Sequence, residues 1–332
     1  MKIKFLKAGE GDSILISYKK HNILVDGGND STFLLKEINL IRDKGEVIDL
    51  MVITHHDDDH IQGIEDLLNH IDSYSNRNEF IKQILFNSPR VIQDTLYDEK
   101  DPTFLSYYQA YKVENLIKRL NLPVKSCTNE TSGMNFENLN IEILSPTKDD
   151  LDKYSSKKGA YLSSDDRCDW SKSLASLEKF LDDDNLDTDL ANKTSIVLNI
   201  SADGRKVLLT GDVTPSRLNC IIDTMYINNN NEPVYFDLIK LPHHGSYRNL
   251  TENILKKINC STFVISTDGK NNFLPNKRAL LKVVKHIYRS SDQPIELIFN
   301  YEAVLDLLKI TEEEQKYYNF KIRSLQNEIS WH

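Results

Sequence analysis

The run Thr54–Gly63 reads T-H-H-D-D-D-H-I-Q-G and constrains this chain more than any other segment. The apolar, β-branched residues 47–53 before it predict a buried strand. Imidazole and carboxylate groups crowded at the end of such a strand are costly to pack unless a cation neutralises them. A divalent metal ion is the natural partner, because it converts carboxylate repulsion into coordination. The alternative, a solvated acidic loop, is disfavoured by the three histidines among the aspartates.

The composition narrows the class of protein. The 332 residues are 39% hydrophobic and 27% charged, which fits one large or two ordinary soluble domains. A net charge of −9 provides no bulk attraction for nucleic acid, although a local basic groove could still bind a polymer. The candidates for such a groove are Lys240, Arg248, Lys256, Lys257, Lys270 and Lys277. We expect no signal peptide and no membrane segment, since no stretch reaches roughly 20 apolar residues. The four cysteines form no C-x-x-C pair, which indicates reduced thiols and a cytoplasmic protein.

Apolar runs and turn residues divide the chain into strands and helices. The expected strands are 2–6, 13–18, 22–25, 80–86, 139–144, 194–201, 206–210, 235–241, 261–266 and 296–300, and the expected helices are 31–43, 64–71, 106–120, 215–225 and 277–287. Residues 147–191 are rich in Ser, Lys and Asp, which indicates an insertion, partly helical near 171–181, with a lid over the site as the alternative. We expect one domain over residues 1–290, with 291–332 as a C-terminal extension packed on it.

Three of the expected strands end in polar clusters. These clusters are Thr54–His60, Gly211–Asp212 and His243–His244. In layered α/β folds, strand ends of this kind meet at one rim, where ligands usually bind. The sequence therefore predicts a metal site assembled from distant parts of the chain.

Together these motifs resemble the metallo-β-lactamase fold superfamily. Within it they are most similar to the branch that contains the hydrolase domain of the bacterial competence DNA-uptake channel protein (ComEC). The residues that carry the resemblance are Leu6–Ser13 with G-E-G-D-S, Leu24–Gly28 (L-V-D-G-G), His55–His60 (H-x-D-x-D-H), Leu208–Asp212 (L-L-T-G-D) and Leu241–Ser246 (L-P-H-H-G-S). The resemblance covers about residues 1–290. It implies an α/β fold, the four-layer αββα metallo-β-lactamase sandwich, with the inserted segment and the C-terminal extension added.

The chain departs from the superfamily pattern at two places. The common motif is H-x-H-x-D-H, whereas Asp57 here replaces the second histidine, as is usual in the competence-type branch. No histidine lies between His70 and His243, so the ligand that many relatives place before the T-G-D strand is missing. Asn192 or Ser195 lies about where that ligand is expected, and one metal position is then weaker.

A dinuclear site needs a carboxylate that both ions share, since the ions lie about 3.5–4 Å apart. Asp212 is the expected bridge, because it follows its own strand beside a glycine. His55 and Asp57 point the same way on an extended backbone and are expected to bind one ion. Asp59 and His60 are expected to bind the other. His56 and Asp58 lie between these residues and alternate outward. We expect them to support the ligands or to face solvent.

The two adjacent histidines are expected to divide the remaining roles. We favour His243 as a metal ligand, because it directly follows the strand end, and His244 as the group that faces the substrate or protonates the leaving group. The reverse assignment stays open. Asp59 is expected to hold the attacking water as well as to ligate. Asp26 and Asp12 are expected to orient ligands by hydrogen bonds, with simple strand-ending turns as the alternative.

Further residues are candidates for substrate binding. Ser246 and Arg248 follow the histidines and suit phosphate oxygens, and Asn192 is placed with them. We expect two divalent ions, with Zn²⁺ as first choice. Because the ligand set is rich in oxygen, which favours harder ions, Mn²⁺ is the alternative. A water whose pKa the metals lower is the expected nucleophile.

The resulting hypothesis is a metal-dependent hydrolase of phosphodiesters, a phosphodiesterase or nuclease acting on a nucleotide or nucleic acid. Two metal ions suit in-line phosphoryl displacement, and the resemblance points the same way. One alternative is an amide, thioester or lactone hydrolase on the same fold. The other is a non-catalytic, metal-stabilised interaction module, whose protein partners the sequence does not indicate.

Overall fold

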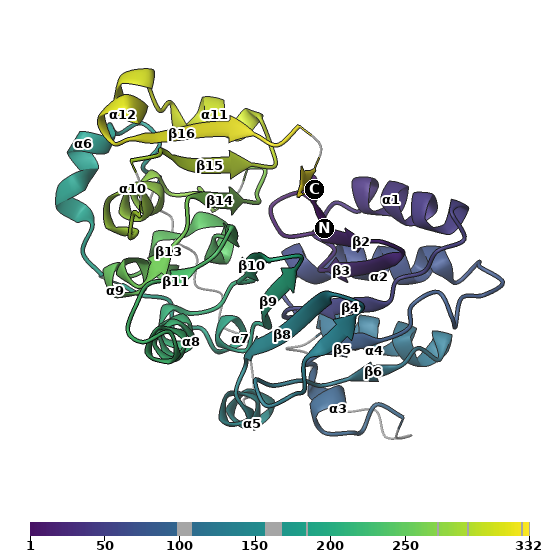
Figure 1. Cartoon of the computed structure of the whole chain (residues 1–332). Helices are drawn as coiled ribbons and strands as arrows, with labels where there is room; N and C mark the ends of the chain where they lie inside the picture. The colour runs from purple at the N-terminus through teal and green to yellow at the C-terminus, as the bar shows by residue number, and fades with distance from the viewer. Residues whose placement is uncertain are drawn as a thin grey trace.

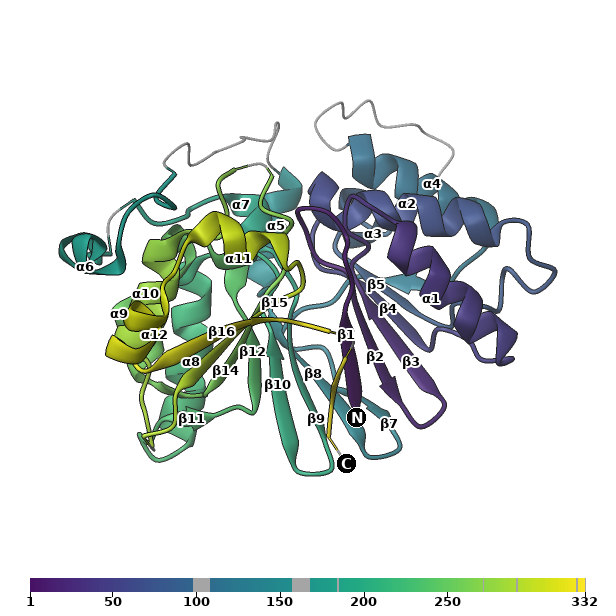
Figure 2. The ribbon, with the colours of Figure 1, turned by 90° about the horizontal axis from the view of Figure 1, so that it is seen from above.

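The chain folds into two β-sheets that pack face to face with helices on both outer sides (Figure 1). The computed structural model describes residues 1–97, 108–156, 168–183, 185–270, 272–290, 292–326 and 328–331. Figure 2 shows helices α1 to α4 outside one sheet and helices α8 to α12 outside the other. This arrangement confirms the expected αββα layering of an α/β fold.

The first sheet contains seven strands in the order β17-β1-β2-β3-β4-β5-β6. Strands β3, β4, β5 and β6 run parallel, so their carboxyl ends lie at one edge. The strands are β1 (Lys2–Phe5), β2 (Ile14–Tyr18), β3 (His21–Val25), β4 (Leu50–Ile53), β5 (Ile84–Phe86), β6 (Val124–Lys125) and β17 (Ile329–Ser330).

The second sheet contains eight strands in the order β16-β15-β14-β12-β10-β9-β8-β7. Five of its strands, from β10 through β12, β14 and β15 to β16, are parallel neighbours. The strands are β7 (Met134–Phe136), β8 (Leu139–Ser145), β9 (Val197–Ala202), β10 (Arg205–Leu209), β12 (Leu238–Lys240), β14 (Thr262–Ile265), β15 (Ile295–Phe299) and β16 (Phe320–Ser324). A separate pair is formed by β11 (Val234–Tyr235) and β13 (Ile258–Asn259).

The longer helices each bury one face against a sheet. In α1, for example, Leu34, Ile38 and Ile41 recur at helical spacing and are buried. The helices are α1 (Thr32–Asp43), α2 (Asp58–Ile71), α3 (Pro89–Ile92), α4 (Tyr108–Leu120), α5 (Lys148–Ser156), α6 (Leu174–Leu177), α7 (Leu190–Lys193), α8 (Pro215–Asn228), α9 (Glu252–Lys256), α10 (Lys277–His286), α11 (Ala303–Leu308) and α12 (Glu312–Tyr317), with 3₁₀ helices η2 (Glu178–Phe180), η3 (Pro242–Gly245) and η4 (Tyr247–Asn249).

Three apolar clusters hold these layers together. One fills the space between the sheets and joins residues such as Ile16 and Val25 to Leu198 and Leu209. The other two lie between each sheet and its helices. Leu67 of α2 belongs to one of them and Val283 of α10 to the other. Alternate strand residues therefore serve different clusters, which fixes the register of both sheets.

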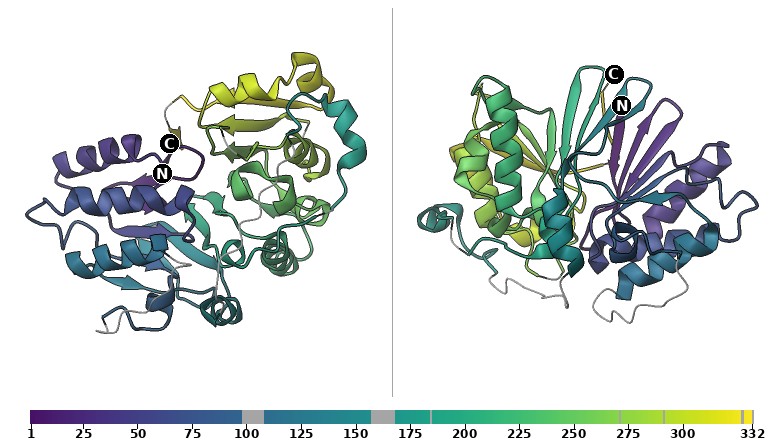
Figure 3. Two further views of the ribbon diagram at one scale, coloured as in Figure 1. Left: turned by 180° about the vertical axis from the view of Figure 1, so that it is seen from behind. Right: turned by 90° about the horizontal axis from the view of Figure 1, so that it is seen from below.

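The structure also places the segments that the sequence set apart. The segment between β8 and β9 contains α5, α6, η2 and α7, which agrees with partial helicity near 171–181, while residues 157–167 and 184 of the expected insertion lie outside the described residues. Residues 106–107 of the expected helix 106–120 also lie outside them. Beyond residue 290, β15 and β16 join the second sheet and β17 pairs with β1, as the views in Figure 3 show near the two termini. Among the described residues, no helix has both the length and the apolarity to cross a membrane.

Candidate metal centre

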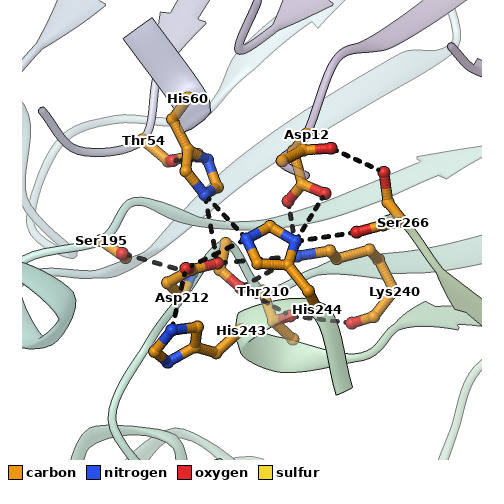
Figure 4. A network of polar contacts seen from close by, with 12 residues as sticks. Asp12, Thr54, His60, Ser195, Thr210, Asp212, Lys240, His243, His244 and Ser266 are labelled. Atoms are coloured by element: carbon orange, nitrogen blue, oxygen red, sulfur yellow. Dashed lines mark hydrogen bonds and ion pairs between the residues drawn. The ribbon is translucent and has the colours of Figure 1, made fainter. Parts of the chain in front are cut away.

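The polar clusters of the sequence meet at the carboxyl ends of the parallel strands (Figure 4). Asp26 follows β3 and Thr54 follows β4, while Asp212 follows β10 and His243 and His244 follow β12. Because β3 pairs in parallel with β4 and β10 pairs in parallel with β12, the ends of each pair lie at one edge of their sheet. The centre therefore takes residues from both sheets.

Two imidazoles and two carboxylates form the inner part of the centre. The Nε2 atoms of His60 and His244 lie 3.3 Å apart. The carboxylate of Asp212 approaches both rings, with Oδ1 at 3.3 Å from His60 Nε2 and Oδ2 at 3.3 Å from His244 Nε2. Asp59 Oδ2 lies 3.0 Å from His244 Nε2 and 3.8 Å from His60 Nε2. The side chains of Asp59, His60, Asp212 and His244 therefore face one another at the centre.

Hydrogen bonds on the far side of each ring determine which nitrogen faces the centre. The Nδ1 of His60 lies 2.8 Å from Asp26 Oδ2, and the Nδ1 of His244 lies 2.8 Å from the backbone oxygen of Ser266. Both acceptors favour a proton on Nδ1, so in the neutral rings both Nε2 atoms carry lone pairs. This assignment of protons follows from the partners of each nitrogen.

Asp26 is a buried carboxylate that supports the centre. Its Oδ1 accepts a hydrogen bond of 2.7 Å from the backbone N–H of Thr54, and its Oδ2 accepts one of 2.6 Å from the Thr54 hydroxyl. With His60 Nδ1 as a third neighbour, the carboxylate links β3 to the chain that leaves β4. Asp26 thus fixes both the strand end and the orientation of the His60 ring.

The donor set of the centre fits a divalent cation. One atom each from Asp12, His60, Asp212 and His244 can be chosen so that all four lie within 4.8 Å of one another, and all four residues are buried. The buried atoms Asp12 Oδ1, His55 Nε2 and Asp212 Oδ1 have no hydrogen-bond partner. Buried polar atoms without a donor are costly in a protein interior. A divalent cation at the centre would satisfy those of Asp12 and Asp212.

An outer group of predicted ligands lies beside the inner one. His55 is buried and stacks near His60 with ring centroids 4.2 Å apart, and its Nε2 lies 3.6 Å from Asp57 Oδ2. His243 lies on another side, with Nε2 at 3.7 Å from Asp212 Oδ2. Asp212 therefore contacts His243 as well as the two inner rings, as a bridging ligand must.

The charges of the inner group are strongly coupled. Burial alone would raise the pKa of Asp212, but the nearby His244 and His60 hold it well below its ordinary value. The pKa of Asp59 is lowered in the same way, against burial, by His60 and His244. Burial lowers and the carboxylates raise the pKa of His60 and His244, and the net result is a raised value, about 10 for His244. The surrounding carboxylates thus favour positive charge on both rings.

The two adjacent histidines have backbone conformations that non-glycine residues rarely adopt. His243 has φ 47° and ψ 53°, and His244 has φ 52° and ψ 24°. Such residues cost roughly 1–3 kcal/mol each and persist where surrounding contacts impose them. Here the backbone N–H of His243 donates to Gly211 O at 3.1 Å, and Ser246 N–H donates to His243 O at 2.8 Å. The turn directs both rings toward Asp212 from one strand end.

The geometry orders the roles of these two histidines. The His244 side chain is 3% exposed and belongs to the inner group, whereas that of His243 is 26% exposed and lies at its rim. The order that the sequence left open, with His244 as the inner ligand, is the one that these contacts favour.

Asp12 lies next to a buried lysine rather than in a simple turn. Lys240 is fully buried, and its Nζ lies 2.5 Å from Asp12 Oδ2 and 3.7 Å from Asp212 Oδ1. Burial lowers and Asp12 raises the pKa of Lys240, with a raised net value. A positive charge therefore lies beside the inner group. Lys240 is thus buried at the centre, whereas the sequence made it a candidate for a substrate groove.

Two close backbone contacts bring the loops of the centre together. A Cβ on Gly11 would lie 1.6 Å from the backbone oxygen of Asp59, so only glycine fits there. A Cβ on Gly27 would lie 2.4 Å from Ile64 N, and Gly63 N–H donates to Gly28 O at 2.7 Å. These glycines explain why the G-E-G-D-S and L-V-D-G-G motifs accompany the histidine motif.

The residues expected to bind substrate are mostly engaged within the protein. Ser246 Oγ accepts a hydrogen bond of 3.3 Å from Arg248 N–H, and Arg248 Nε donates to Asn185 O at 2.8 Å. Asn192 is buried on α7, where its Nδ2 donates to Asp187 Oδ2 at 2.8 Å. Ser195 Oγ accepts from Asp212 N–H at 3.3 Å.

The extended backbone expected through His60 ends earlier than predicted. Helix α2 begins at Asp58 with Asp57 as its N-cap residue, so Asp59 and His60 lie on the first helical turn. Asp58 is exposed, but His56 is buried rather than facing solvent, with Nδ1 at 2.8 Å from the Tyr154 hydroxyl. The packing of α5 over this segment buries the His56 ring.

The sequence reasoning missed Asp187. Its carboxylate is buried, and Oδ2 lies 3.4 Å from His243 Nδ1 and accepts from Asn249 Nδ2 at 2.9 Å. Burial raises but the contacts with His243 lower the pKa of Asp187, to about 2. Asp187 lies within the polar segment 147–191, where no local pattern distinguishes it from the other aspartates.

Comparisons with known proteins agree with the motifs of the first 75 residues. Residues 6–75 match the family model of the metallo-beta-lactamase superfamily. This segment contains the G-E-G-D-S, L-V-D-G-G and H-x-D-x-D-H motifs and therefore Asp12, Asp26 and His60. No curated protein matches the sequence.

Several solved structures share the general outline of the fold. Zn²⁺-bound PqqB from Methylobacterium extorquens has 10% identity and a TM-score of 0.46, with 100% of both chains covered. The short form of human tRNase Z has 12% identity and a TM-score of 0.44, with 99% of both chains covered. Unliganded yeast PDE1 has 13% identity and a TM-score of 0.44, with 98% of this chain and 97% of that chain covered. At this level of similarity, none of them assigns a reaction to this chain.

Proposed function

We propose that this chain is a metal-dependent hydrolase that cleaves a phosphodiester at a dinuclear centre. The observation that carries the proposal is the convergence of His60, His244, Asp59 and Asp212, whose ligand atoms face one another within a buried site. The match of residues 6–75 to the metallo-beta-lactamase superfamily supports the same class of chemistry. The L-L-T-G-D and L-P-H-H-G-S motifs support a place in the ComEC-type branch.

The geometry suggests how the ligands divide between two positions. We assign Asp59, His60 and His244 to an inner position and His55, Asp57 and His243 to an outer one, with Asp212 shared. When bound, two divalent ions lower the pKa of water and stabilise charge on phosphoryl oxygens. Mixed imidazole and carboxylate ligands suit Zn²⁺ first and Mn²⁺ second.

Among these residues, Asp59 is the one placed to act on the nucleophile. Its side chain is 28% exposed, while that of Asp212 is 3% exposed, so Asp59 presents an accessible carboxylate edge. A carboxylate with one edge toward solvent can orient an attacking water by accepting its hydrogen bond. His244 is too buried to meet a leaving group, and we assign it to ligation.

The distribution of basic side chains favours a small phosphodiester over a polymer. The six basic residues that we considered for a substrate groove are each engaged with the protein: Lys240 with Asp12, Arg248 with Asn185 O, Lys256 with Glu252, Lys257 with Asp223, Lys270 with Asp268 and Lys277 with Lys172 O. A long nucleic acid needs uncompensated positive charge along its path. A nucleotide or cyclic dinucleotide needs much less.

The test combines metal content with turnover. Protein is stripped with a chelator, reconstituted with Zn²⁺ or Mn²⁺, analysed for bound metal, and assayed on bis-p-nitrophenyl phosphate, cyclic dinucleotides and single-stranded DNA. We expect metal-dependent turnover that falls by at least about a hundredfold in Asp212→Asn and His60→Gln. Asp58→Asn is the matched control, because Asp58 is exposed in the same motif.

Other outcomes would support other functions. Turnover of lactones or chromogenic β-lactams without turnover of phosphodiesters would indicate an acyl hydrolase on the same centre. Stoichiometric metal binding without any turnover would indicate an interaction module. A protein that retains no divalent ion would contradict both the phosphodiesterase and the acyl hydrolase hypotheses.

A further inference from the structure

The buried carboxylate of Asp187 is held in a fixed orientation against His243. Its Oδ2 accepts hydrogen bonds from Asn192 Nδ2 at 2.8 Å and from Asn249 Nδ2 at 2.9 Å, and it lies 3.4 Å from His243 Nδ1. Its Oδ1 accepts the backbone N–H of Asp189 at 2.9 Å. Both oxygens are therefore engaged, and the carboxylate cannot rotate without breaking several contacts.

His243 is oriented in the same way as the two inner imidazoles. The Nδ1 of His60 faces Asp26, the Nδ1 of His244 faces a backbone oxygen, and the Nδ1 of His243 faces Asp187, with Asn249 Oδ1 also at 3.2 Å. In all three residues Nε2 points toward Asp212. An imidazole with Nδ1–H held by an acceptor presents the unprotonated Nε2 that binds metal.

Asn192 does not replace the missing histidine directly. The family resemblance implies a ligand before the T-G-D strand at about Asn192 or Ser195, but the amide of Asn192 donates to Asp187. Its Oδ1 is buried without a hydrogen-bond partner. Asn192 thus supports Asp187, the residue that orients His243. The imidazole that stands in for the missing histidine is then His243, which follows β12.

We infer that Asp187 is a positioning residue that holds His243 as the imidazole ligand of the outer metal position. The pair takes the place of the histidine that this chain lacks near Asn192. The inference rests on the metal centre proposed above and adds a residue to it that lies outside every motif of the sequence.

Asp187 reaches the centre on a segment that is tied to the second sheet and its helices. We call this segment the strap and define it as the described residues 168–183 and 185–193. Asp169 at its start accepts the backbone N–H groups of Lys277 and Arg278 at 2.8 Å each. Further along, the fully buried Lys282 donates to Asp183 Oδ1 at 2.9 Å.

The strap is also tied immediately before Asp187. Arg248 Nε donates to Asn185 O at 2.8 Å, and Asp187 N–H donates to Arg248 O at 3.0 Å. Arg248 lies on η4, directly after the η3 turn that carries His243, so the strap is hydrogen-bonded to the same stretch of chain as the histidine. This connection explains how a residue from a polar segment can position a ligand.

The test measures each bound ion separately in Asp187→Asn. An amide at this position removes the negative charge that faces His243 Nδ1 and cannot accept all the hydrogen bonds that Asp187 accepts, so the ring is held less firmly with Nε2 toward Asp212. We expect one Zn²⁺ to bind about 10–100-fold more weakly by chelator competition, as for other residues that orient metal-bound histidines. The second ion should bind with unchanged affinity. Asp182→Asn, an exposed strap residue, is the control and should change neither ion.

A second variant separates positioning from a structural role. If Asp187 acts through His243, Asp187→Asn should add little to the loss of affinity already caused by His243→Gln, so the double variant should be non-additive. A purely structural role would instead lower the melting temperature of the metal-free protein and weaken both ions together. Melting curves in chelator therefore accompany the titrations.

The outcomes distinguish this inference from the proposed function. Three outcomes would overturn the inference and leave a metal centre in place. The Asp187→Asn variant could retain both ions at wild-type affinity, the double variant could show additive losses, or the wild-type protein could bind one ion only. Wild-type protein that binds no ion at all would overturn the proposed function itself.

Discussion

At the scale of single residues, the centre is built from imidazoles whose second ring nitrogen is already occupied. A carboxylate faces Nδ1 of His60 and of His243, and a backbone oxygen faces Nδ1 of His244. Carboxylates raise the basicity of the ring that they contact, while a backbone oxygen mainly orients it. Substitution of Asp26 or Asp187 should therefore tune metal affinity, and the two positions should respond independently.

Asp26 offers the first prediction at this scale. Asp26→Asn keeps an oxygen for the Thr54 N–H but cannot accept from both the Thr54 hydroxyl and the His60 ring. We expect metal affinity to fall about 10–100-fold and the free energy of unfolding to fall by about 1–3 kcal/mol. Chelator competition and urea denaturation measure the two effects. Asp30→Asn, on the same loop, should leave both unchanged, and equal effects of the two variants would contradict the role given to Asp26.

The second prediction concerns the pH dependence of the metal-free protein. Burial lowers and Asp212 raises the pKa of His244, to about 10, and His60 is raised as well. A group with a raised pKa in the folded state stabilises that state below its unfolded pKa of about 6.5, and this contribution is lost as pH rises through the folded value. We therefore expect the free energy of unfolding in chelator to fall between pH 6.5 and 10.

His244→Gln is the matched variant for this pH effect. Without the titrating ring, the decline measured by urea denaturation between pH 6.5 and 10 should become shallower than in the wild type. Identical slopes for the two proteins would show that His244 does not carry the effect. The same linkage means that metal binding displaces protons, so metal affinity should rise with pH over this range.

The sequence predicted the role of a site residue where a motif marked it. It did not do so where the residue's contacts are distant along the chain. The T-H-H-D-D-D-H run and the two later strand ends indicated a shared site because strand ends converge. Asp187 lies among other aspartates and contacts His243 and Asn249 some 56 and 62 residues away, as the separations in the sequence show. Nothing local distinguishes such a residue. Lys240 was a candidate for a basic substrate groove, but it is buried against Asp12.

At the scale of elements, the strap supplies a cap that α10 lacks in its own sequence. The side chain of the N-cap residue Asn276 makes no capping hydrogen bond, and Asp169 accepts from the first two helical N–H groups instead. The carboxylate also lies at the positive end of the helix, which favours negative charge. The helix and the strap therefore stabilise each other.

Asp169 gives the third prediction. Asp169→Ala leaves two backbone N–H groups of α10 without their acceptor, and we expect the free energy of unfolding to fall by about 1–2 kcal/mol. Hydrogen exchange should rise within the strap, because its first anchor is lost. Asp182→Ala is the control, since Asp182 is exposed on the same segment. Unchanged exchange in the strap of Asp169→Ala would mean that Lys282 and Arg248 hold it alone.

Element boundaries depended on tertiary contacts more than on local pattern. The strands before Thr54, Asp212 and His243 were predictable from short apolar runs. The start of α2 was not: the helix begins at Asp58 rather than at the expected residue 64, and it packs closely against Gly27 in the loop after β3 at Gly63 and Ile64. This early start turns Asp59 and His60 toward Asp212 by helical rather than extended geometry.

At the scale of the whole molecule, the centre joins two halves that each have their own apolar cluster. His60 and Asp26 come from the first sheet side, while Asp212 and His244 come from the second. A ligand that binds only the folded state stabilises it by RT ln(1 + [L]/Kd). Metal bound here therefore stabilises the packing of the sheets as well as the site, and its removal should loosen their contact.

The last prediction concerns the C-terminal segment, whose strands belong to both sheets. Deletion of residues 291–332 removes β15 and β16 and with them the buried Leu297, Ile298 and Phe299. Each such side chain contributes about 1.5–3 kcal/mol when buried, and the loss approaches the whole stability of roughly 5–15 kcal/mol of a typical domain. We expect this truncated protein to be unfolded or aggregated by circular dichroism and size-exclusion chromatography. Deletion of 328–332 removes the short β17 pairing with β1, the Lys2–Glu328 ion pair and the partly buried Ile329 and Trp331, and the protein should remain folded with lower stability. A folded, metal-binding protein lacking 291–332 would show instead that the second sheet is complete at β14.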